Sequence, residues 1–360
     1  MAILDKITVA GFKSIRSLEG FKLRNLNVLI GANGAGKSNF IGLFELLSAL
    51  MAKRLQLFAQ EHDGPDAILF GGRKKTPVLH VELFFGSNAY EIELKPAGQR
   101  LIFQTENTKF FSFPYHLPHF LGTAHQEALL PDISDTFTLF AQEALASWHI
   151  YHFHDTSTSA AVRQAGAVRD NLLLKPDAGN LAAFLRRLRQ SHQKEYDQIV
   201  ATLRLVAPFF GDFVYRDESG ELIELEWTQA DDPDTVLGPR QLSDGTLRFI
   251  CLATLLLQPA KLRPDTILID EPELGLHPYA VAILATLLRQ ASGGGKQLIV
   301  STQSVELVNE LSPQDVIVVD RKDGASVFER LDAERLKDWL EDYALGELWK
   351  MNVLGGRPSR

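Results

Sequence analysis

The sequence predicts an α/β fold in which one chain carries a parallel sheet, an antiparallel meander and a helical insertion. A β-prone apolar run at 27–30 ends at a glycine-rich loop, and a helical pattern follows at 37–50. Strand and helix patterns alternate again between 266 and 320, which is typical of a parallel sheet. Between 79 and 104, short β-prone stretches are separated by Gly, Ser, Asn and Pro, which favours antiparallel hairpins.

The first third of the chain is expected to contain strands on both sides of the helix at 37–50. Residues 3–12 form a β-prone stretch ahead of the apolar run at 27–30. The meander is expected to contain three strands, at residues 79–85, 90–94 and 101–104. We therefore place a first lobe, which holds the glycine-rich loop and the meander, at residues 1–106.

From about residue 107 the pattern changes to helical periodicity. Apolar residues recur at helical spacing, at Leu181, Leu185, Leu188, Tyr196, Ile199 and Leu203. The segment 107–235 is therefore predicted to be a mainly helical insertion or lid. It also carries a basic group that could contact phosphates, although a solvated helix face is the favoured interpretation; the group is Arg186, Arg187, Arg189 and Lys194.

The α/β pattern returns after a polar turn at 231–234. An apolar helix is expected to begin near residue 247. Strands then follow at 266–270, 297–302 and 316–320, with a helix at 279–290. We place a second lobe at 236–330 and a helical tail at 331–360.

Composition excludes several classes of protein. With 45% hydrophobic and 23% charged residues in 360, the chain is an ordinary globular protein. The net charge of -8 provides no general basic field, so any contact with nucleic acid must be local. The single cysteine, Cys251, cannot form an intrachain disulfide and is expected to be a small apolar core group.

We expect a cytoplasmic protein that does not insert into membranes. No apolar run approaches the roughly 20 residues that cross a bilayer. The charges of Asp5 and Lys6 interrupt the apolar stretch that a signal peptide needs.

The strongest functional pattern lies between the first apolar strand and the helix that follows it. It matches G-x-x-x-x-G-K-[ST], in which main-chain N–H groups surround phosphate oxygens. Lys37 is expected to neutralise the β- and γ-phosphates, and the Ser38 hydroxyl to bind Mg²⁺. The sequence thus predicts a P-loop site for ATP and Mg²⁺ formed by Gly31, Ala32, Asn33, Gly34, Ala35, Gly36, Lys37, Ser38 and Asn39.

Two adjacent carboxylates end the apolar strand at 266–270. Burying a charge at the end of a strand costs free energy unless the charge binds a ligand or partner. The alternative is that both carboxylates are simply exposed to solvent. Asp270 is suited to bind Mg²⁺, and Glu271 to polarise an attacking water as general base.

Residues 242–246 precede the helix expected near 247, and on their own they predict a helix N-cap. Their place among the other motifs changes this interpretation. The ordered set resembles the ABC-type ATPases of the RecF and SMC branch, most closely the bacterial RecF-like predicted AAA ATPases. The set comprises 31–38, 242–246, 266–271, 273–278 and 301–304, and the stretches 151–157, 177–181 and 345–349 are also similar to that group.

The resemblance implies a nucleotide site that is shared between two copies of the chain. Ser243, Asp244 and Gly245 would form the ABC signature, which approaches the γ-phosphate bound to the opposite subunit. Asp244 stands where many relatives have glycine. Residues 273–278 would be the D-loop, and Gln303 would occupy the switch position, which is usually histidine. A glutamine amide cannot take up a proton, so turnover is expected to be slow.

Other implied positions stay open. Residues 12–16 resemble the opening of this branch, where cations lie near the nucleotide, but an exposed turn fits equally well. A zinc site is disfavoured, because no second ligand pair accompanies His149, His152 and His154. The candidates for the Q-loop position are Gln60, Gln104 and the His154–Asp155 pair.

The resulting hypothesis is an ABC-type ATPase head in which Lys37, Glu271 and Gln303 carry catalysis and ATP joins two identical subunits. About 230 residues separate Ser38 from Asp270, too few for long coiled-coil arms. The resemblance implies a role in DNA repair or maintenance or in phage defence, with DNA or a separate effector protein as partner. The alternative is a nucleotide-gated interaction module with little turnover, which the glutamine at 303 and the acidic composition favour.

Overall fold

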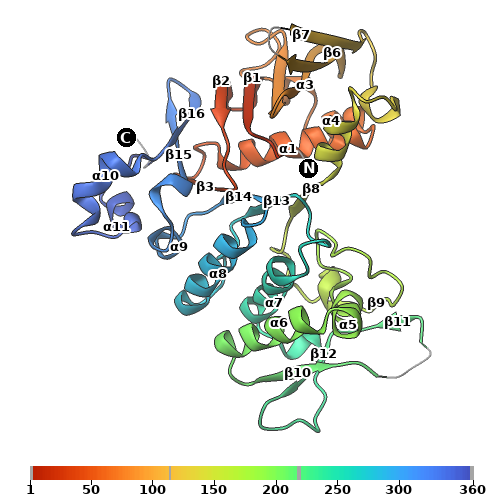
Figure 1. Ribbon diagram of the computed structural model, residues 1–360, viewed down its shortest axis with the longest axis vertical. Helices are drawn as coiled ribbons and strands as arrows, with labels where there is room; N and C mark the ends of the chain where they lie inside the picture. Colours follow the sequence, from red (N-terminus) through yellow and green to blue (C-terminus); the bar gives the residue numbers. More distant parts are fainter. Residues whose placement is uncertain (1–2, 113–114, 217–219, 357–360) are drawn as a thin grey trace.

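The computed structural model describes residues 3–112, 115–216 and 220–356 (Figure 1). Two six-stranded sheets form its framework. Helix α1 (Lys37–Met51) lies between them, and its buried side chains belong to a core cluster that includes residues of both sheets. The mixed α/β architecture with an antiparallel meander agrees with the sequence prediction.

The first of these sheets has the strand order β16-β15-β3-β14-β13-β8, and all neighbours are parallel except β15 and β16. Strands β3, β13 and β14 are almost entirely buried, as expected for apolar strands covered on both faces. Their carboxyl ends meet at one edge, the place where such sheets carry their binding sites. The strands are β3 (Leu26–Ile30), β8 (Trp148–Tyr151), β13 (Thr266–Asp270), β14 (Gln297–Ser301), β15 (Val316–Lys322) and β16 (Ala325–Arg330).

The second sheet is antiparallel, with the order β2-β1-β4-β5-β6-β7. Buried and partly exposed residues alternate along β1 and β4, because one face of the sheet packs toward α1. The strands are β1 (Lys6–Phe12), β2 (Ile15–Lys22), β4 (Leu79–Phe85), β5 (Asn88–Ala97), β6 (Arg100–Ser112) and β7 (Tyr115–Gly122).

Helices cover the other face of the parallel sheet. Helix α7 (Asp244–Leu257) is buried from Leu247 to its end, and it contacts helices α6 and α8. None of the described helices is long and apolar enough to cross a membrane. The remaining helices are α2 (Leu55–Glu61), α3 (Pro65–Ile68), α4 (Leu139–Ala146), α5 (Leu181–Ser191), α6 (Gln193–Val206), α8 (Pro278–Ala291), α9 (Val305–Asn309), α10 (Ala333–Leu340) and α11 (Leu345–Lys350).

The prediction that 107–235 is mainly helical was wrong for much of that segment. Strands β6 and β7 continue the antiparallel sheet, and β8 is an edge strand of the parallel sheet. Two short strand pairs flank α5 and α6: β10 (Phe210–Val214) pairs with β12 (Glu226–Gln229), and β9 (Gly166–Ala167), which precedes α5, pairs with β11 (Leu222–Ile223).

The first part of β6 matches the strand predicted at 101–104, but its continuation to Ser112 was missed because polar residues occupy buried positions there. Glu106 and Thr108 are both buried, where an apolar alternation would have signalled a strand. The Glu106 carboxylate accepts hydrogen bonds from the Tyr90 hydroxyl (2.8 Å) and from the main-chain N–H of Leu130 (3.0 Å). These bonds offset the cost of burying a charge, but they cannot be read from the local sequence.

We expect Cys251 to be unreactive until the protein unfolds. The residue is 2% exposed in α7, which confirms its predicted place in the core, and burial raises the pKa of its thiol to about 12. The reactive thiolate is therefore scarce near neutral pH. Titration with a disulfide reagent such as dithiobis(nitrobenzoate) should label one thiol per chain in guanidinium chloride and essentially none in the native protein. Fast labelling of the native protein would contradict this burial.

Candidate functional site

The glycine-rich loop joins β3 to α1 through backbone angles that favour glycine. Gly31 and Gly36 have φ values of +152° and +118°. A Cβ at Gly31 would lie 2.2 Å from a carbonyl oxygen of β15, so the loop tolerates no side chain there. The buried Lys37 ammonium donates to the carbonyl oxygens of Gly31 (2.7 Å) and Ala32 (3.2 Å). The loop therefore curls around this cation at the N-terminus of α1, an arrangement that suits phosphate groups.

Side chains outside the motif support the loop from behind. The Ser326 hydroxyl contacts the carbonyl oxygen of Ala35 and lies 2.7 Å from the Ser14 hydroxyl. Asn39 donates from Nδ2 to the same Ser14 oxygen, at 2.7 Å. Ser14 falls in the stretch that resembled the opening of the family, whereas nothing in the sequence pointed to Ser326.

A cavity of about 630 Å³ opens beside the loop. Lys13 and Arg321 line it, and Arg321 donates to the carbonyl oxygen of Gly34 at 3.1 Å. Burial lowers the pKa of Lys13. Arg16 donates instead to the carbonyl oxygen of Asp323, at 2.8 Å. Lys13 thus lies next to the P-loop, whereas Arg16 is engaged with a surface turn.

The two predicted carboxylates lie at the end of β13. Glu271 has a φ of +41°, a conformation that costs a non-glycine residue about 1–3 kcal/mol. Its main-chain N–H donates to the carbonyl oxygen of Ser301 at 3.0 Å, and the Ser301 hydroxyl donates to Asp270. Burial lowers the pKa of Lys37, and the charges of Glu271 and Asp270 partly offset that shift. The carboxylates are thus near enough to the ammonium of Lys37 to favour its charged form.

Gln303 follows β14 and contacts the predicted base directly. Its Nε2 donates a hydrogen bond to Oε1 of Glu271. The amide can hold the carboxylate in one orientation, but it cannot exchange a proton with it. Among the described residues, the structure thus brings Lys37, Asp270, Glu271 and Gln303 together at the carboxyl ends of three adjacent strands.

Glu273 connects the two loops that follow β13 and β14. Its Oε1 accepts hydrogen bonds from the Thr302 hydroxyl (2.6 Å) and from the main-chain N–H of Gln303 (3.0 Å). Its Oε2 is buried and has no hydrogen-bond partner among the described residues. Burial raises the pKa of Glu273, and the neighbouring charge of Glu271 adds to the shift.

The turn at the start of α7 lies apart from this cluster. Ser243 caps the helix, and its exposed hydroxyl oxygen accepts from the main-chain N–H of Thr246 at 3.1 Å. A Cβ at Gly245 would lie 2.5 Å from the carbonyl oxygen of Gly275, so residues of the predicted D-loop pack directly on this turn. Within the described part of the chain, no hydrogen bond or ion pair joins the turn to the glycine-rich loop.

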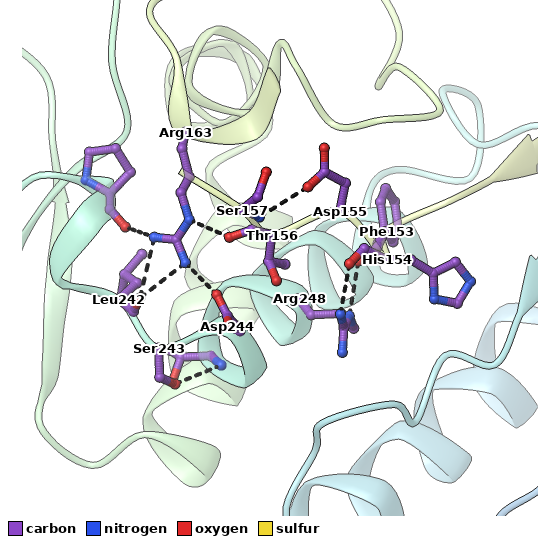
Figure 2. Close-up of polar contacts among 12 residues, drawn as sticks. Phe153, His154, Asp155, Thr156, Ser157, Arg163, Leu242, Ser243, Asp244 and Arg248 are labelled. Carbon is purple, nitrogen blue, oxygen red and sulfur yellow. Dashed lines mark hydrogen bonds and ion pairs between the residues drawn. The ribbon is translucent and has the colours of Figure 1, made fainter. Parts of the chain in front are cut away.

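Two buried arginines near this turn were missed by sequence reasoning (Figure 2). Arg248 donates to the carbonyl oxygens of Phe153 (2.9 Å), His154 (3.0 Å) and Leu274. Burial lowers the pKa of its guanidinium. A lone cation at the start of an apolar helix run was a usable signal, since a buried charge needs partners. The other arginine, Arg163, gave no comparable signal.

The candidates for the Q-loop position occupy different parts of the fold. Gln60 lies in α2, and Gln104 donates to Glu93 at 2.9 Å in the antiparallel sheet. His154 and Asp155 follow β8, which pairs with β13. Of these three candidates, the His154–Asp155 pair follows a strand next to the one that carries the carboxylates. The described residues contain no group of three or more His, Cys, Asp or Glu side chains placed to hold a metal ion.

Comparison with protein families gives one match over most of the chain. Residues 26–309 match the family described as "AAA domain, putative AbiEii toxin, Type IV TA system". This range includes the glycine-rich loop, the turn before α7 and the carboxylates at the end of β13.

Two curated relatives match over a shorter stretch. A "Putative ABC transporter ATP-binding protein" of Methanosarcina acetivorans is 35% identical over 80 residues, which cover 22% of this chain and 28% of the relative. A protein of Streptomyces avermitilis with the same description is 39% identical over 80 residues, covering 22% of this chain and 14% of the relative. The matches therefore span less than a third of the length of either relative.

Two solved structures share the fold over nearly the whole chain. The SmcHead crystallised with the C-winged helix domain of ScpA is 17% identical with a TM-score of 0.63, over 93% of this chain and 99% of that one. The Smc head domain with an extended coiled coil, bound to the C-terminal domain of ScpA derived from Pyrococcus furiosus, is 15% identical with a TM-score of 0.55, over 95% and 99%. The chain therefore shares its fold with SMC heads, and the match over residues 26–309 shows that it belongs to the AAA-domain family.

Proposed function

We propose that this chain binds and hydrolyses ATP with Mg²⁺, and that it does so as a homodimer whose nucleotide sites lie between the subunits. One observation carries the proposal: the loop that holds Lys37 after β3 and the carboxylates at the end of β13 lie on either side of β14, and Gln303, which follows β14, holds Glu271 by a hydrogen bond. This set provides a cation for the phosphates, a carboxylate for a metal ion and a carboxylate for a water nucleophile.

The residues present fit a magnesium–nucleotide complex. The main-chain loop closes around the Lys37 ammonium, which donates to the carbonyl oxygens of Gly31 and Ala32, and Ser38 is exposed on the first turn of α1. Hydroxyl and carboxylate oxygens are the ligands that Mg²⁺ prefers, so Ser38 and Asp270 would hold the ion. When bound, Mg²⁺ would withdraw charge from the β- and γ-phosphate oxygens.

The protein side chains would then act in order. Lys37 would exchange its two carbonyl partners for phosphate oxygens. Glu271 would orient the attacking water and accept its proton at the carboxylate. Gln303 would keep Glu271 in place without adding a proton acceptor of its own, which favours slow turnover.

The separation of the two nucleotide motifs supports a homodimer. Ser243 is exposed, and its hydroxyl is bonded within its own helical turn rather than to the glycine-rich loop. The N-terminus of α7 carries the positive end of the helix dipole, which would suit an anion. A second copy would bring Ser243 and Gly245 to the γ-phosphate held by Lys37. We further propose that His154 and Asp155 stand where relatives carry the Q-loop glutamine.

In the cell, we propose a cytoplasmic role in phage defence or in DNA repair and maintenance. The family description names a toxin of a type IV toxin–antitoxin system, which supports the defence role. The alternative, a nucleotide-gated interaction module with little turnover, is favoured by the amide at Gln303.

Phosphate release and dimerisation of the purified chain, each measured with and without double-stranded DNA, separate these functions. Stimulated turnover supports action on DNA, whereas ATP-dependent dimerisation with negligible turnover supports the interaction module.

Replacing Lys37 with alanine should abolish nucleotide retention. The change removes the cation that the loop surrounds, and charged hydrogen bonds of this kind are worth about 1.5–3 kcal/mol each. Equilibrium dialysis with labelled ATP is the measurement, and Lys261→Ala, which changes an exposed lysine, is the matched control. Equal ATP binding by Lys37→Ala and the control would refute the role of Lys37.

Glu271→Gln should keep ATP binding and reduce hydrolysis by about 100-fold or more, the contribution expected of a general base. Single-turnover phosphate release measures the chemical step, and Glu310→Gln serves as a control on an exposed carboxylate. An unchanged single-turnover rate would exclude Glu271 as the base.

Glu273→Gln should stabilise the protein against heat increasingly as the pH rises. Because the pKa of Glu273 is raised in the folded state, the folded protein binds this proton more tightly than the unfolded chain does. Stability is therefore lost as the pH rises from the ordinary carboxyl pKa through the raised value, and glutamine removes that loss. The test compares thermal midpoints of both proteins between mildly acidic and mildly alkaline pH. A midpoint difference that does not change with pH would contradict the shift.

A further inference from the structure

Arg163 is buried against the segment that leads into α7. Its side chain is 6% exposed, and every nitrogen of its guanidinium is engaged (Figure 2). Nε donates to the carbonyl oxygen of Thr156 at 2.8 Å, and both Nη atoms lie 3.3 Å from the carbonyl oxygen of Leu242. One Nη also contacts the carbonyl oxygen of Pro239, and the other donates to Oδ1 of Asp244 at 2.8 Å. A planar fork of five donors can satisfy such a set, whereas an ammonium cannot.

Among the acceptors of Arg163, Asp244 is the one carboxylate, and it is the residue of the turn that departs from the family pattern. Its side chain is 68% exposed, in contrast to that of its partner. It follows Ser243 directly, at the first position of α7. By the family resemblance, Asp244 stands where many relatives have glycine, which would leave the helix N-terminus free of negative charge. An unpaired carboxylate at this point would repel a phosphate that approaches the Ser243 hydroxyl.

We propose that Arg163 is a positioning residue for the signature turn, which fixes the main chain at 239–244 and neutralises Asp244. The turn can then present its serine hydroxyl and main-chain N–H groups to the γ-phosphate held by a second copy. This inference rests on the proposed ATP-dependent homodimer and adds a residue that the nucleotide motifs do not contain.

Arg163 also links the turn before α7 to the segment that follows β8, which lies beside the carboxylates of β13. Arg163 bonds to Thr156, and the segment that carries Thr156 also carries His154, whose carbonyl oxygen is bound by Arg248. That segment leaves β8, the neighbour of the strand that ends in Asp270. The two arginines therefore tie the signature helix to a segment beside the carboxylates by main-chain contacts.

The experiment uses the full chain with Glu271→Gln, so that ATP stays bound during the measurement. Arg163→Gln removes the charge and the fork but keeps an amide that can donate. The matched control is Arg187→Gln, because Arg187 also donates to main-chain carbonyl oxygens, those of Asn171 (2.9 Å) and Leu172 (2.7 Å), away from the turn. ATP affinity is measured by dialysis at low protein concentration, and dimerisation with ATP by sedimentation velocity.

We expect Arg163→Gln to bind ATP like the parent chain and to weaken the dimer about tenfold or more, the effect of losing a charge-assisted hydrogen bond. Arg187→Gln should dimerise normally. Adding Asp244→Asn to Arg163→Gln should recover part of the lost dimer affinity, because it removes the unpaired carboxylate. A purely structural role for Arg163 predicts no such recovery.

Unchanged dimerisation of Arg163→Gln, or no recovery on adding Asp244→Asn, would overturn the inference while leaving the proposed function intact. If Arg163→Gln does not fold, Arg163→Lys retains the charge without the fork and should still weaken the dimer. Normal dimerisation of Arg163→Lys would then overturn the inference. A parent chain that stays monomeric with ATP would overturn the proposed function, and the inference with it.

Discussion

The parallel pairing of β3, β14 and β13 is the constraint on which the site depends. Asp270 pairs with Ser301, and Ser301 pairs with Leu29, so the three strands end at the same level of the sheet. Each strand then leads into one part of the candidate site: the glycine-rich loop follows β3, Gln303 follows β14, and Asp270 and Glu271 stand at the end of β13. A shift of one residue in this register would turn Asp270 to the other face and separate it from the Ser301 hydroxyl.

The sequence predicted those parts of the fold whose signal is local. Strand β13 and the P-loop were predicted because a few consecutive residues determine each of them. The second half of β6, beyond the predicted 101–104, was missed because its buried positions hold Glu106 and Thr108, and the main-chain N–H that Glu106 binds belongs to Leu130. The same limit applies to the site. The motifs named Lys37 and Glu271, but the hydrogen bonds that Ser326 makes behind the loop depend on how β16 is placed.

Gln303 contacts two glutamates, which its position in the sequence alone does not predict. Its side chain holds Glu271, while its main-chain N–H donates to Glu273. One residue thus connects the predicted base with the loop that packs on the signature turn. A histidine there would bring a titratable ring to the same place; the amide makes this contact independent of pH in the physiological range.

The course of the chain through β8 limits where the region that contains α5 and α6 could be exchanged between related proteins. The polypeptide leaves the antiparallel lobe, adds an edge strand to the central sheet, and only then enters the region that contains α5 and α6. Residues 153–163 thereby connect the parallel sheet with the region that contains α5 and α6, and they contact α7 and the segment that leads into it. An exchange of insertions between related proteins would have to begin downstream of Arg163 and finish upstream of Pro239, because a cut placed earlier or later would sever the core itself.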